Sequence, residues 1–250
     1  MMNPAEYANI ERCEREFWWF QGMERILFEM LDPFVANRGK LRAVETGCGT
    51  GHLSTRFRDR YGWQVYPTDL QFDGLSYGLQ HGVPRMVQAD MRSLPFPDAQ
   101  FDVSLSIDVI AHLPHGVEHE AIKGLVRVLK PGGLLVMRTS ALDILRSNHS
   151  AFTTERQRFT RGRFVNLVES HGIRVLRCSY VNSLLMPVAL VKFRLVEPLL
   201  RSQVESGVQP VSPWLNRLLS RFLETEAKWL ATGRNFPLGQ SLVLIGERCA

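Results

Sequence analysis

The sequence predicts an α/β fold: a doubly wound, mostly parallel sheet of seven strands, with an N-terminal helix and a helical insertion before the last strand. Two observations predict it. From residue 41 onwards, short apolar segments of strand length alternate with segments of helical period. The segment FDVSLSI (101–107) is mostly apolar throughout, as a strand covered by helices on both faces should be.

The predicted elements follow in chain order. Residues 4–35 are expected to form a helix, because large apolar residues recur near helical spacing until Asp32-Pro33 ends the run. The segment LKPGG (129–133) is expected to stop the helix before it, since a basic residue, proline and glycine often follow a helix end. Strands are predicted at 41–46, 63–69, 84–90, 101–107, 134–140, 173–181 and 241–248, and helices at 52–60, from near Phe72, and at 115–129, 161–170 and 184–231.

The 250 residues suffice for one large α/β domain. We expect a single domain over 1–250, in which a helical lid occupies 1–36 and a core 37–183. A helical insertion is expected at 184–236 and the last strand at 237–250.

Composition excludes several classes of protein. The opening is polar and charged, and the apolar stretch 184–200 is interrupted by charges and prolines, so we expect neither a secretory signal nor a membrane span. The four cysteines form no C-x-x-C pair, which disfavours a zinc site and a disulfide framework and favours the cytoplasm. The net charge of +5 is modest, and no basic tract is interleaved with aromatics, so no nucleic acid is expected as partner. The sequence contains no cluster of carboxylates and histidines that would indicate a metal site, so no metal is expected.

The strongest local signal is the turn ETGCGTG (45–51), between a predicted strand and a predicted helix. Glycines there permit positive φ and let the backbone pass close under a ligand. The N–H groups that open the next helix can receive an anionic or polar group. Asp69, at the end of the second strand, is placed where a carboxylate can accept both hydroxyls of a ribose.

Three features favour S-adenosylmethionine over a nicotinamide dinucleotide. The spacing G-x-G-x-G is tighter than the G-x-G-x-x-G that makes room for a pyrophosphate. Glu45, before the first glycine, would repel a pyrophosphate but can accept hydrogen bonds from an ammonium group. Asp90, which closes the third strand, can accept from an adenine amino group. A nicotinamide-dependent oxidoreductase is therefore the disfavoured alternative.

These motifs, with LPFPDAQFD (94–102) behind them, closely resemble the class I S-adenosylmethionine-dependent methyltransferases of the type-11 methyltransferase-domain group, over roughly residues 40–140. The resemblance implies a Rossmann-like fold in which the glycines wrap the methionine part, with Glu45 near its amino group. It also implies that Asp69 holds the ribose and that Asp90 and the Met91 backbone hold the adenine. The expected cofactor-binding residues are Glu45, Gly47, Cys48, Gly49, Gly51, Asp69, Leu70, Asp90, Met91 and Asp108.

The ends of the chain resemble a narrower bacterial subgroup. FWWFQG (17–22) is similar to its H-W-W-F-R-G opening, and LRSNHSAFTTERQRFT (145–160) to its L-W-S-x-H-D-(x)-G-H-x-R-R-Y-T segment. Many members sit among genes for cell-surface glycan or lipid-linked sugar synthesis, which implies a small-molecule, sugar or lipid-linked glycan acceptor. Ser150, Glu155 and Gln157 stand where the subgroup has Asp, His and Arg. Because of these departures two alternatives stay open: the protein acts on a different acceptor, or it binds S-adenosylmethionine without catalysing a reaction.

The predicted reaction is O-methylation by in-line methyl transfer, in which positioning supplies much of the acceleration. A hydroxyl acceptor also needs a base near its proton, and histidine is suited to that at neutral pH. The candidates are His112, after the fourth strand, and His149, after the fifth, because doubly wound sheets bind ligands at the carboxyl ends of their strands. For His112 the alternative is a helix-start residue bonded to backbone.

Two apolar segments keep more than one interpretation. The aromatic run 17–20 could cover the cofactor or pin the first helix to the domain. The insertion 184–230 contains an amphipathic helix, which could pack on the domain or a dimer mate, cover the acceptor site, or make peripheral membrane contact. A monomer and a homodimer both stay open. The cations that would favour a membrane are Arg201, Arg217, Arg221 and Lys228.

Overall fold

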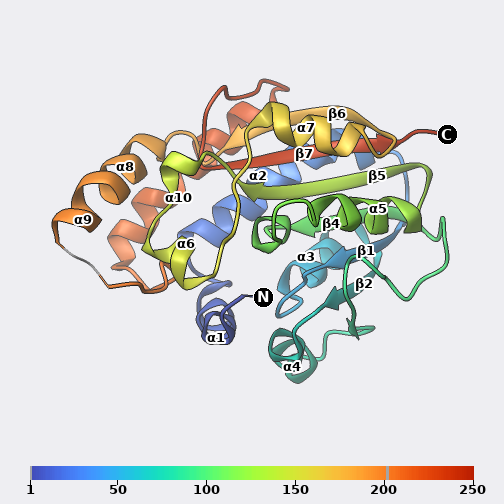
Figure 1. The fold of residues 1–250 in the computed structure, drawn as a ribbon, viewed down its shortest axis with the longest axis horizontal. Coiled ribbons are helices and arrows are strands. Elements are labelled where there is room, and N and C mark those ends of the chain that lie inside the picture. The colour runs from blue at the N-terminus through green and yellow to red at the C-terminus, as the bar shows by residue number, and fades with distance from the viewer. Residues whose placement is uncertain (1, 201–202) are drawn as a thin grey trace.

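The computed structural model describes residues 2–200 and 203–250. Within these residues, seven strands form one sheet in the order β3-β2-β1-β4-β5-β7-β6 (Figure 1). Strands β1 to β5 pair in parallel, and β7 runs antiparallel to both β5 and β6. The strands are β1 (Arg42–Thr46), β2 (Gln64–Asp69), β3 (Val87–Gln88), β4 (Phe101–Ile107), β5 (Leu129–Ser140), β6 (Ile173–Val181) and β7 (Ser241–Arg248). The predicted doubly wound, mostly parallel sheet is confirmed.

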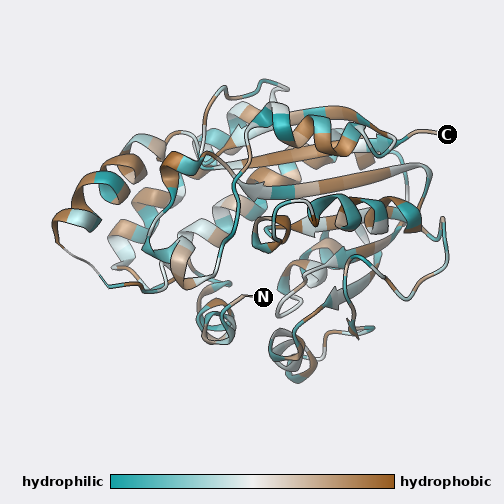
Figure 2. Ribbon diagram, viewed as in Figure 1, coloured by the Kyte–Doolittle hydropathy of each residue, from teal (hydrophilic) through white to brown (hydrophobic). Residues whose placement is uncertain are grey.

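Helices cover both faces of the sheet, with α5 and α7 in front and α2 behind in Figure 1. Side chains of α2, α3 and α10 pack on one face, and those of α5 and α7 on the other. Figure 2 shows the central strands as apolar segments between the two helical layers. The helices are α1 (Pro4–Cys13), α2 (Trp18–Val35), α3 (His52–Tyr61), α4 (Phe72–Gln80), η1 (Ile110–His112), α5 (Glu118–Val128), η2 (Asp143–Leu145), α6 (Asn148–Phe152), α7 (Arg161–Glu169), α8 (Met186–Val191), η3 (Lys192–Val196), α9 (Glu197–Leu199) and α10 (Pro213–Ala231).

The prediction of one helix over 4–35 is wrong. The chain leaves the helix after Cys13, and α2 begins at Trp18, whose backbone N–H donates to the side-chain oxygen of Asn216 at 2.9 Å. Asn216 belongs to α10, so this start depends on a distant contact. Pro33 lies inside α2 instead of ending it, two residues before the helix ends at Val35, so the lost hydrogen bond and the clash of its ring disturb only the last turn.

Two further boundaries differ from the prediction. The third strand shrinks from 84–90 to Val87–Gln88 at the edge of the sheet, after Arg85 takes a positive φ of 61°. The predicted helix at 115–129 covers only Glu118–Val128, and the segment 129–133 forms the start of β5. Leu129 pairs with Phe101, and the register shift that follows absorbs the Pro131 turn.

The predicted helical insertion is confirmed only in part. Helices α8, η3 and α9 follow one another without a break, η3 being a π-helical turn, but residues 203–212 are not helical. Arg201 lies outside the described residues. No helix in the described part of the chain has the length and apolar character needed to cross a bilayer.

Candidate active site

The site lies where the carboxyl ends of β1, β2, β4 and β5 meet, at one edge of the sheet. The glycine turn connects β1 to α3. Gly47, Gly49 and Gly51 have φ of 71°, 54° and 73°, a region that disfavours any residue with a Cβ. A Cβ at Gly47 would also lie 2.2 Å from the side chain of Val109, so this turn admits only glycine at its first position.

Asp69, at the end of β2, is bonded to the glycine turn. Its Oδ2 accepts a hydrogen bond of 2.8 Å from the backbone N–H of Gly49, and its Oδ1 accepts one of 2.9 Å from that of Gln71. Burial raises the pKa of Asp69, and the bonds from these backbone groups oppose the shift. The carboxylate is therefore held in place beside the turn.

Glu45, at the end of β1, is a second buried carboxylate, only 2% exposed. The Ser54 hydroxyl, on α3, donates to it. Burial raises the pKa of Glu45 to about 7, Ser54 lowers it, and nearby Asp69 raises it further. Among the described residues no cation forms an ion pair with either carboxylate, although the charge of Arg138 also lowers the pKa of Glu45. The turn is therefore suited to an ammonium group and to hydroxyl donors.

Arg138 is the buried cation at this edge of the sheet. Its Nε and Nη2 lie 3.0 and 2.6 Å from Oδ2 of Asp108, and its guanidinium lies 5.1 Å from the centre of the Trp19 ring. The Asp108 backbone N–H donates to the Arg138 carbonyl at 2.8 Å, with φ of 60° at Asp108. Asp108, an expected cofactor residue, is thus held by β5. Arg138 was not predicted as a site residue, although a charged residue near the end of a predicted strand is a usable signal.

Helix α1 covers the glycine turn. The Tyr7 hydroxyl lies 3.4 Å from Oδ1 of Asp69, and the Thr50 hydroxyl donates to Oε2 of Glu14 at 2.6 Å. Tyr7 and Glu14 are both buried, and burial raises the pKa of Glu14 to about 7. Neither residue was predicted, because contacts between α1 and the turn leave no local pattern. The aromatic run lies beyond this helix, where Phe17 packs against Cys13 and Val208.

The remaining cofactor candidates lie around this centre. Asp90 follows β3, whose Gln88 pairs with Asp69, but both oxygens of Asp90 bind the Arg92 guanidinium at 2.5–3.0 Å. Met91 is buried in the core against α5, and Leu70 is largely exposed. Cys48 is buried, and its backbone N–H donates to the Thr68 carbonyl at 2.9 Å. Asp90 is thus paired with Arg92, and its two oxygens keep lone pairs for a further donor.

His112 lies in η1, directly after β4. Its Nδ1 is buried without a hydrogen-bond partner among the described residues, while the backbone of Thr154 bonds to the ring. Burial lowers the pKa of His112, and the charges of Glu155 and Asp108 oppose that shift. At neutral pH the ring is therefore uncharged and keeps one nitrogen able to accept a proton.

His149 lies in α6, in the loop after β5. Its Nδ1 accepts a hydrogen bond of 2.9 Å from the backbone N–H of Gly207 and lies 3.9 Å from Oε1 of buried Glu6. Burial lowers the pKa of His149, with Glu6 as the largest opposing influence. In an uncharged ring whose Nδ1 accepts a hydrogen bond, Nε2 carries the proton, so His149 keeps no free nitrogen to accept another one. Nδ1 of His112 is free to do so, and the geometry therefore favours His112 as the base.

The three departures from the subgroup pattern all form internal bonds. Ser150 caps α6 with Ser147 and accepts from Arg158 at 2.9 Å, and Glu155 forms a buried ion pair of 2.5 Å with Arg158. The fully buried Gln157 donates to the Leu113 carbonyl at 3.0 Å. Its backbone N–H donates to the Ala111 carbonyl, so these residues hold the His149 loop against η1.

Comparison with known proteins agrees with this geometry. The methyltransferase-domain family of type 11 matches residues 44–137. The malonyl acyl-carrier-protein O-methyltransferase of Pectobacterium atrosepticum is 30% identical over 126 residues, which are 49% of this chain and 47% of the relative. The ubiquinone/menaquinone biosynthesis C-methyltransferase UbiE of Ectopseudomonas oleovorans is 34% identical over 121 residues, 45% of this chain and 70% of that protein.

The likeness in fold extends over the whole chain, although the chain spans only about half the length of the first of these relatives. One chain of the complex between the Haloferax volcanii Trm112 methyltransferase activator and a methyltransferase superposes with a TM-score of 0.61, at 15% identity, over 98% of both chains. The fold, the glycine turn and the similar proteins all indicate the same family. The chain belongs to the class I S-adenosylmethionine-dependent methyltransferase family, with a type-11 methyltransferase domain.

Proposed function

We propose that this protein binds S-adenosylmethionine at the glycine turn and transfers its methyl group to a hydroxyl of a small-molecule, sugar or lipid-linked acceptor. One observation carries the proposal. Three glycines of positive φ lie between two buried carboxylates, Glu45 on β1 and Asp69 on β2. Such a turn receives a ligand with a cationic end and hydroxyl donors.

The residues present fit this cofactor. Glu45 would hold its ammonium group, Asp69 its ribose hydroxyls, and Asp90 with the Met91 backbone its adenine. The same carboxylates would repel a pyrophosphate, and the buried cation Arg138 is already paired with Asp108. When bound, S-adenosylmethionine supplies an activated methyl group for in-line displacement.

His112 is the group we assign to the acceptor proton. Its buried, unpartnered Nδ1 would accept that proton as the acceptor oxygen attacks. The resulting imidazolium would be stabilised by the charges of Asp108 and Glu155, both of which favour the protonated ring. His149 is the alternative base, through its Nδ1 once the hydrogen bond from Gly207 is released.

Retained catalysis is favoured over a role limited to cofactor binding. Glu155 pairs with Arg158, and Gln157 bonds to backbone around η1, so these departures leave an intact loop beside His112. The names of the relatives, an O-methyltransferase of a malonyl acyl-carrier protein and a C-methyltransferase of ubiquinone/menaquinone biosynthesis, support methyl transfer to an acceptor other than a nucleic acid.

Titration calorimetry tests the proposal. Purified protein should bind S-adenosylmethionine and S-adenosylhomocysteine with micromolar affinity, and the Asp69→Ala variant should bind neither measurably. Transfer of a labelled methyl group to lipid-linked sugar acceptors then tests turnover. Absence of binding to either compound by the folded wild-type protein would refute the proposal, whereas binding without transfer to any hydroxyl acceptor would favour the non-catalytic alternative.

A further inference from the structure

The helical segment 186–199 carries an apolar stripe that faces away from the protein. Val188, Val191, Leu195 and Leu199 recur at spacings of three, four and four, so they lie near one side of the helical segment. Val188, Leu195 and Leu199 are 64%, 63% and 82% exposed. Figure 2 shows this segment as a largely apolar helix at the outer end of the molecule. Aliphatic side chains presented in one row are typical of an interaction surface.

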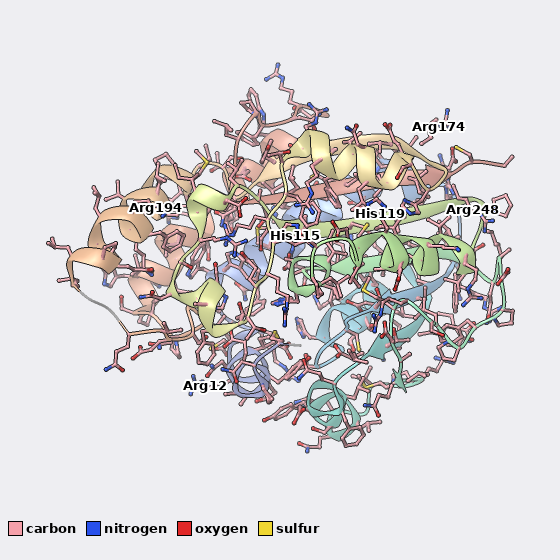
Figure 3. The ribbon with its side chains drawn as sticks, in the orientation of Figure 1. Arg12, His115, His119, Arg174, Arg194 and Arg248 are labelled. Atoms are coloured by element: carbon pink, nitrogen blue, oxygen red, sulfur yellow. The ribbon has the colours of Figure 1, made fainter. Side chains whose placement is uncertain are left out.

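The stripe is held in this position by the opposite side of the helix. Glu197 accepts a hydrogen bond of 2.9 Å from the backbone N–H of Asn148, at the start of the helix that carries His149. Arg194, labelled in Figure 3, donates to the Ile144 carbonyl at 2.6 Å. The inner side is therefore fixed to the loop after β5, and the outer stripe has no freedom to turn inward.

Helix α10 adds a second apolar row at the same end of the molecule (Figure 1). Trp214, Leu218 and Phe222 are spaced four residues apart and exposed, while the other side of α10 packs on α2. Next to this row, the guanidinium groups of Arg217 and Arg221 have no hydrogen bond or ion pair among the described residues. The ammonium group of Lys192 on η3 has no ion pair there either, and lies 5.9 Å from the centre of the Phe193 ring. An apolar row beside unpaired cations characterises a helix that lies in the interface of an anionic bilayer.

We propose that residues 184–199 and the Trp214 row of α10 form a surface that binds anionic membranes. Charge selects this occupant over a second copy of the chain. A twofold interface would bring the Arg217 and Arg221 cations towards those of the other copy. Glu224, the next carboxylate along α10, does not compensate for these cations because it is already paired with Arg25.

This surface has a consequence for the acceptor, which rests on the proposed methyl transfer. The Glu197–Asn148 bond joins the membrane-binding segment to α6, so the His149 loop lies beside the bilayer when the stripe is inserted. An acceptor anchored by a lipid could then present its polar end to the site without leaving the membrane. The acceptor class is therefore an amphiphile with an anionic or polar head at the membrane surface.

Vesicle co-sedimentation tests the surface without reference to methyl transfer. The probes are phosphatidylcholine vesicles with and without roughly a third of phosphatidylglycerol, at low and high salt. The wild-type protein should pellet with the anionic vesicles at low salt, and at least about fivefold less with the neutral ones. Leu195→Glu/Leu199→Glu and Arg217→Glu/Arg221→Glu should each lose most of this binding.

Matched controls change the same residue types elsewhere on the surface. Leu79→Glu/Leu238→Glu replaces two leucines that are 53% and 50% exposed, and Lys40→Glu/Lys123→Glu reverses two exposed lysines. Both should bind like the wild type, with unchanged thermal unfolding in all four variants. Calorimetry with S-adenosylmethionine on each variant separates a failure of this surface from a failure of the proposed function.

Three results would overturn the proposal. The wild-type protein could fail to pellet with anionic vesicles, or the stripe variants could bind as well as the wild type. Sedimentation velocity without lipid could instead reveal a dimer that Leu195→Glu/Leu199→Glu disperses, which would assign the stripe to a second copy.

Discussion

Asp69 and Gly49 are joined by a 2.8 Å hydrogen bond from the glycine N–H to the carboxylate, so the end of β2 supports the middle of the glycine turn. The other oxygen of Asp69 lies 3.4 Å from the Tyr7 hydroxyl of the covering helix. A ribose that bonds to this carboxylate must therefore displace Tyr7 or share the oxygen with it. Cofactor binding and the position of α1 are coupled through one side chain.

The first prediction separates the two tasks of Asp69. Asp69→Asn keeps an oxygen for the Gly49 N–H but loses the negative charge, whereas Asp69→Ala loses both. We expect affinity for S-adenosylmethionine to fall about tenfold in the first variant and at least about a hundredfold in the second, since charge-assisted bonds are the stronger ones. Calorimetry measures both, and Asp73→Ala, on the exposed side of α4, should leave the affinity unchanged.

The second prediction concerns the cost of burying Glu45. The pKa of Glu45 is about 7 in the folded protein, above the usual 4.5. Protonation of Glu45 therefore favours the folded state, and this contribution to the free energy of unfolding is complete below pH 4.5 and is lost as the pH rises through 7. Glu45→Gln should therefore raise the free energy of unfolding at pH 8, by up to about 3 kcal/mol, and change it little at pH 4. Urea unfolding at the two pH values measures the difference. An equal effect at both would contradict the assignment. Glu14→Gln, measured under the same conditions, gives the pH-dependent change in the free energy of unfolding that is due to Glu14, whose pKa is also about 7.

The third prediction follows from the same carboxyl. An ammonium group bound beside Glu45 lowers its pKa, so binding of S-adenosylmethionine should release a proton below pH 7, and affinity should weaken as the pH falls through 7. Calorimetry in buffers of different ionisation enthalpy counts the protons. In Glu45→Gln the affinity should be lower and this pH dependence reduced; an unaltered proton release there would place the titration elsewhere.

The fourth prediction ranks the two histidines. His112→Ala should lower kcat by about a hundredfold or more while cofactor affinity stays the same, because only proton transfer is lost. Since burial lowers the pKa of His112, activity of the wild type should persist below pH 6.5 and decline only at more acidic pH. His115→Ala, an exposed neighbour, is the matched control. If His149→Ala proved the more damaging change, the assignment would be reversed.

The fifth prediction tests the network behind the His149 loop. Gln157→Ala removes a buried side chain that donates to the Leu113 carbonyl and to Glu118, and leaves both acceptors without it. We expect a loss of about 2 kcal/mol in unfolding free energy and a fall in kcat with little change in cofactor affinity. Thr160→Ala, which removes a side-chain cap of α7, is a control that should cost about 1 kcal/mol and spare kcat.

Local pattern was enough to predict the sheet and the carboxylates of the glycine turn. Glu45 and Asp69 each end a strand whose apolar run is visible in the sequence, and strand ends meet at one edge of a parallel sheet. The start of α2 was not predictable in this way, because the backbone of Trp18 is capped by Asn216 from the far end of the chain. Pro33 led to a wrong prediction of the helix end for a different reason, because the effect of a proline depends on its position in the helix.

The residues that cover the site were not predicted from the sequence, for the same physical reason as the cap of α2. Tyr7 reaches Asp69 through contacts between segments remote in sequence, and no periodicity in α1 records that packing. Arg138 could have been found, since it lies near the end of β5, but its pairing with the predicted residue Asp108 could not. Whether His112 or His149 acts as the base depends on which ring nitrogen is already bonded, which only coordinates display.

The insertion departs from the sheet after Val181 and returns at Ser241, and these two residues are paired partners in neighbouring strands. A segment whose two ends meet in this way can be lengthened, shortened or replaced without altering the register of any strand. The donor half of the enzyme, built on β1 to β4, is separate from it in the chain. Descendants of one ancestral gene could thus acquire new acceptors by exchanging this segment, while the half that binds the methyl donor stayed under constant selection.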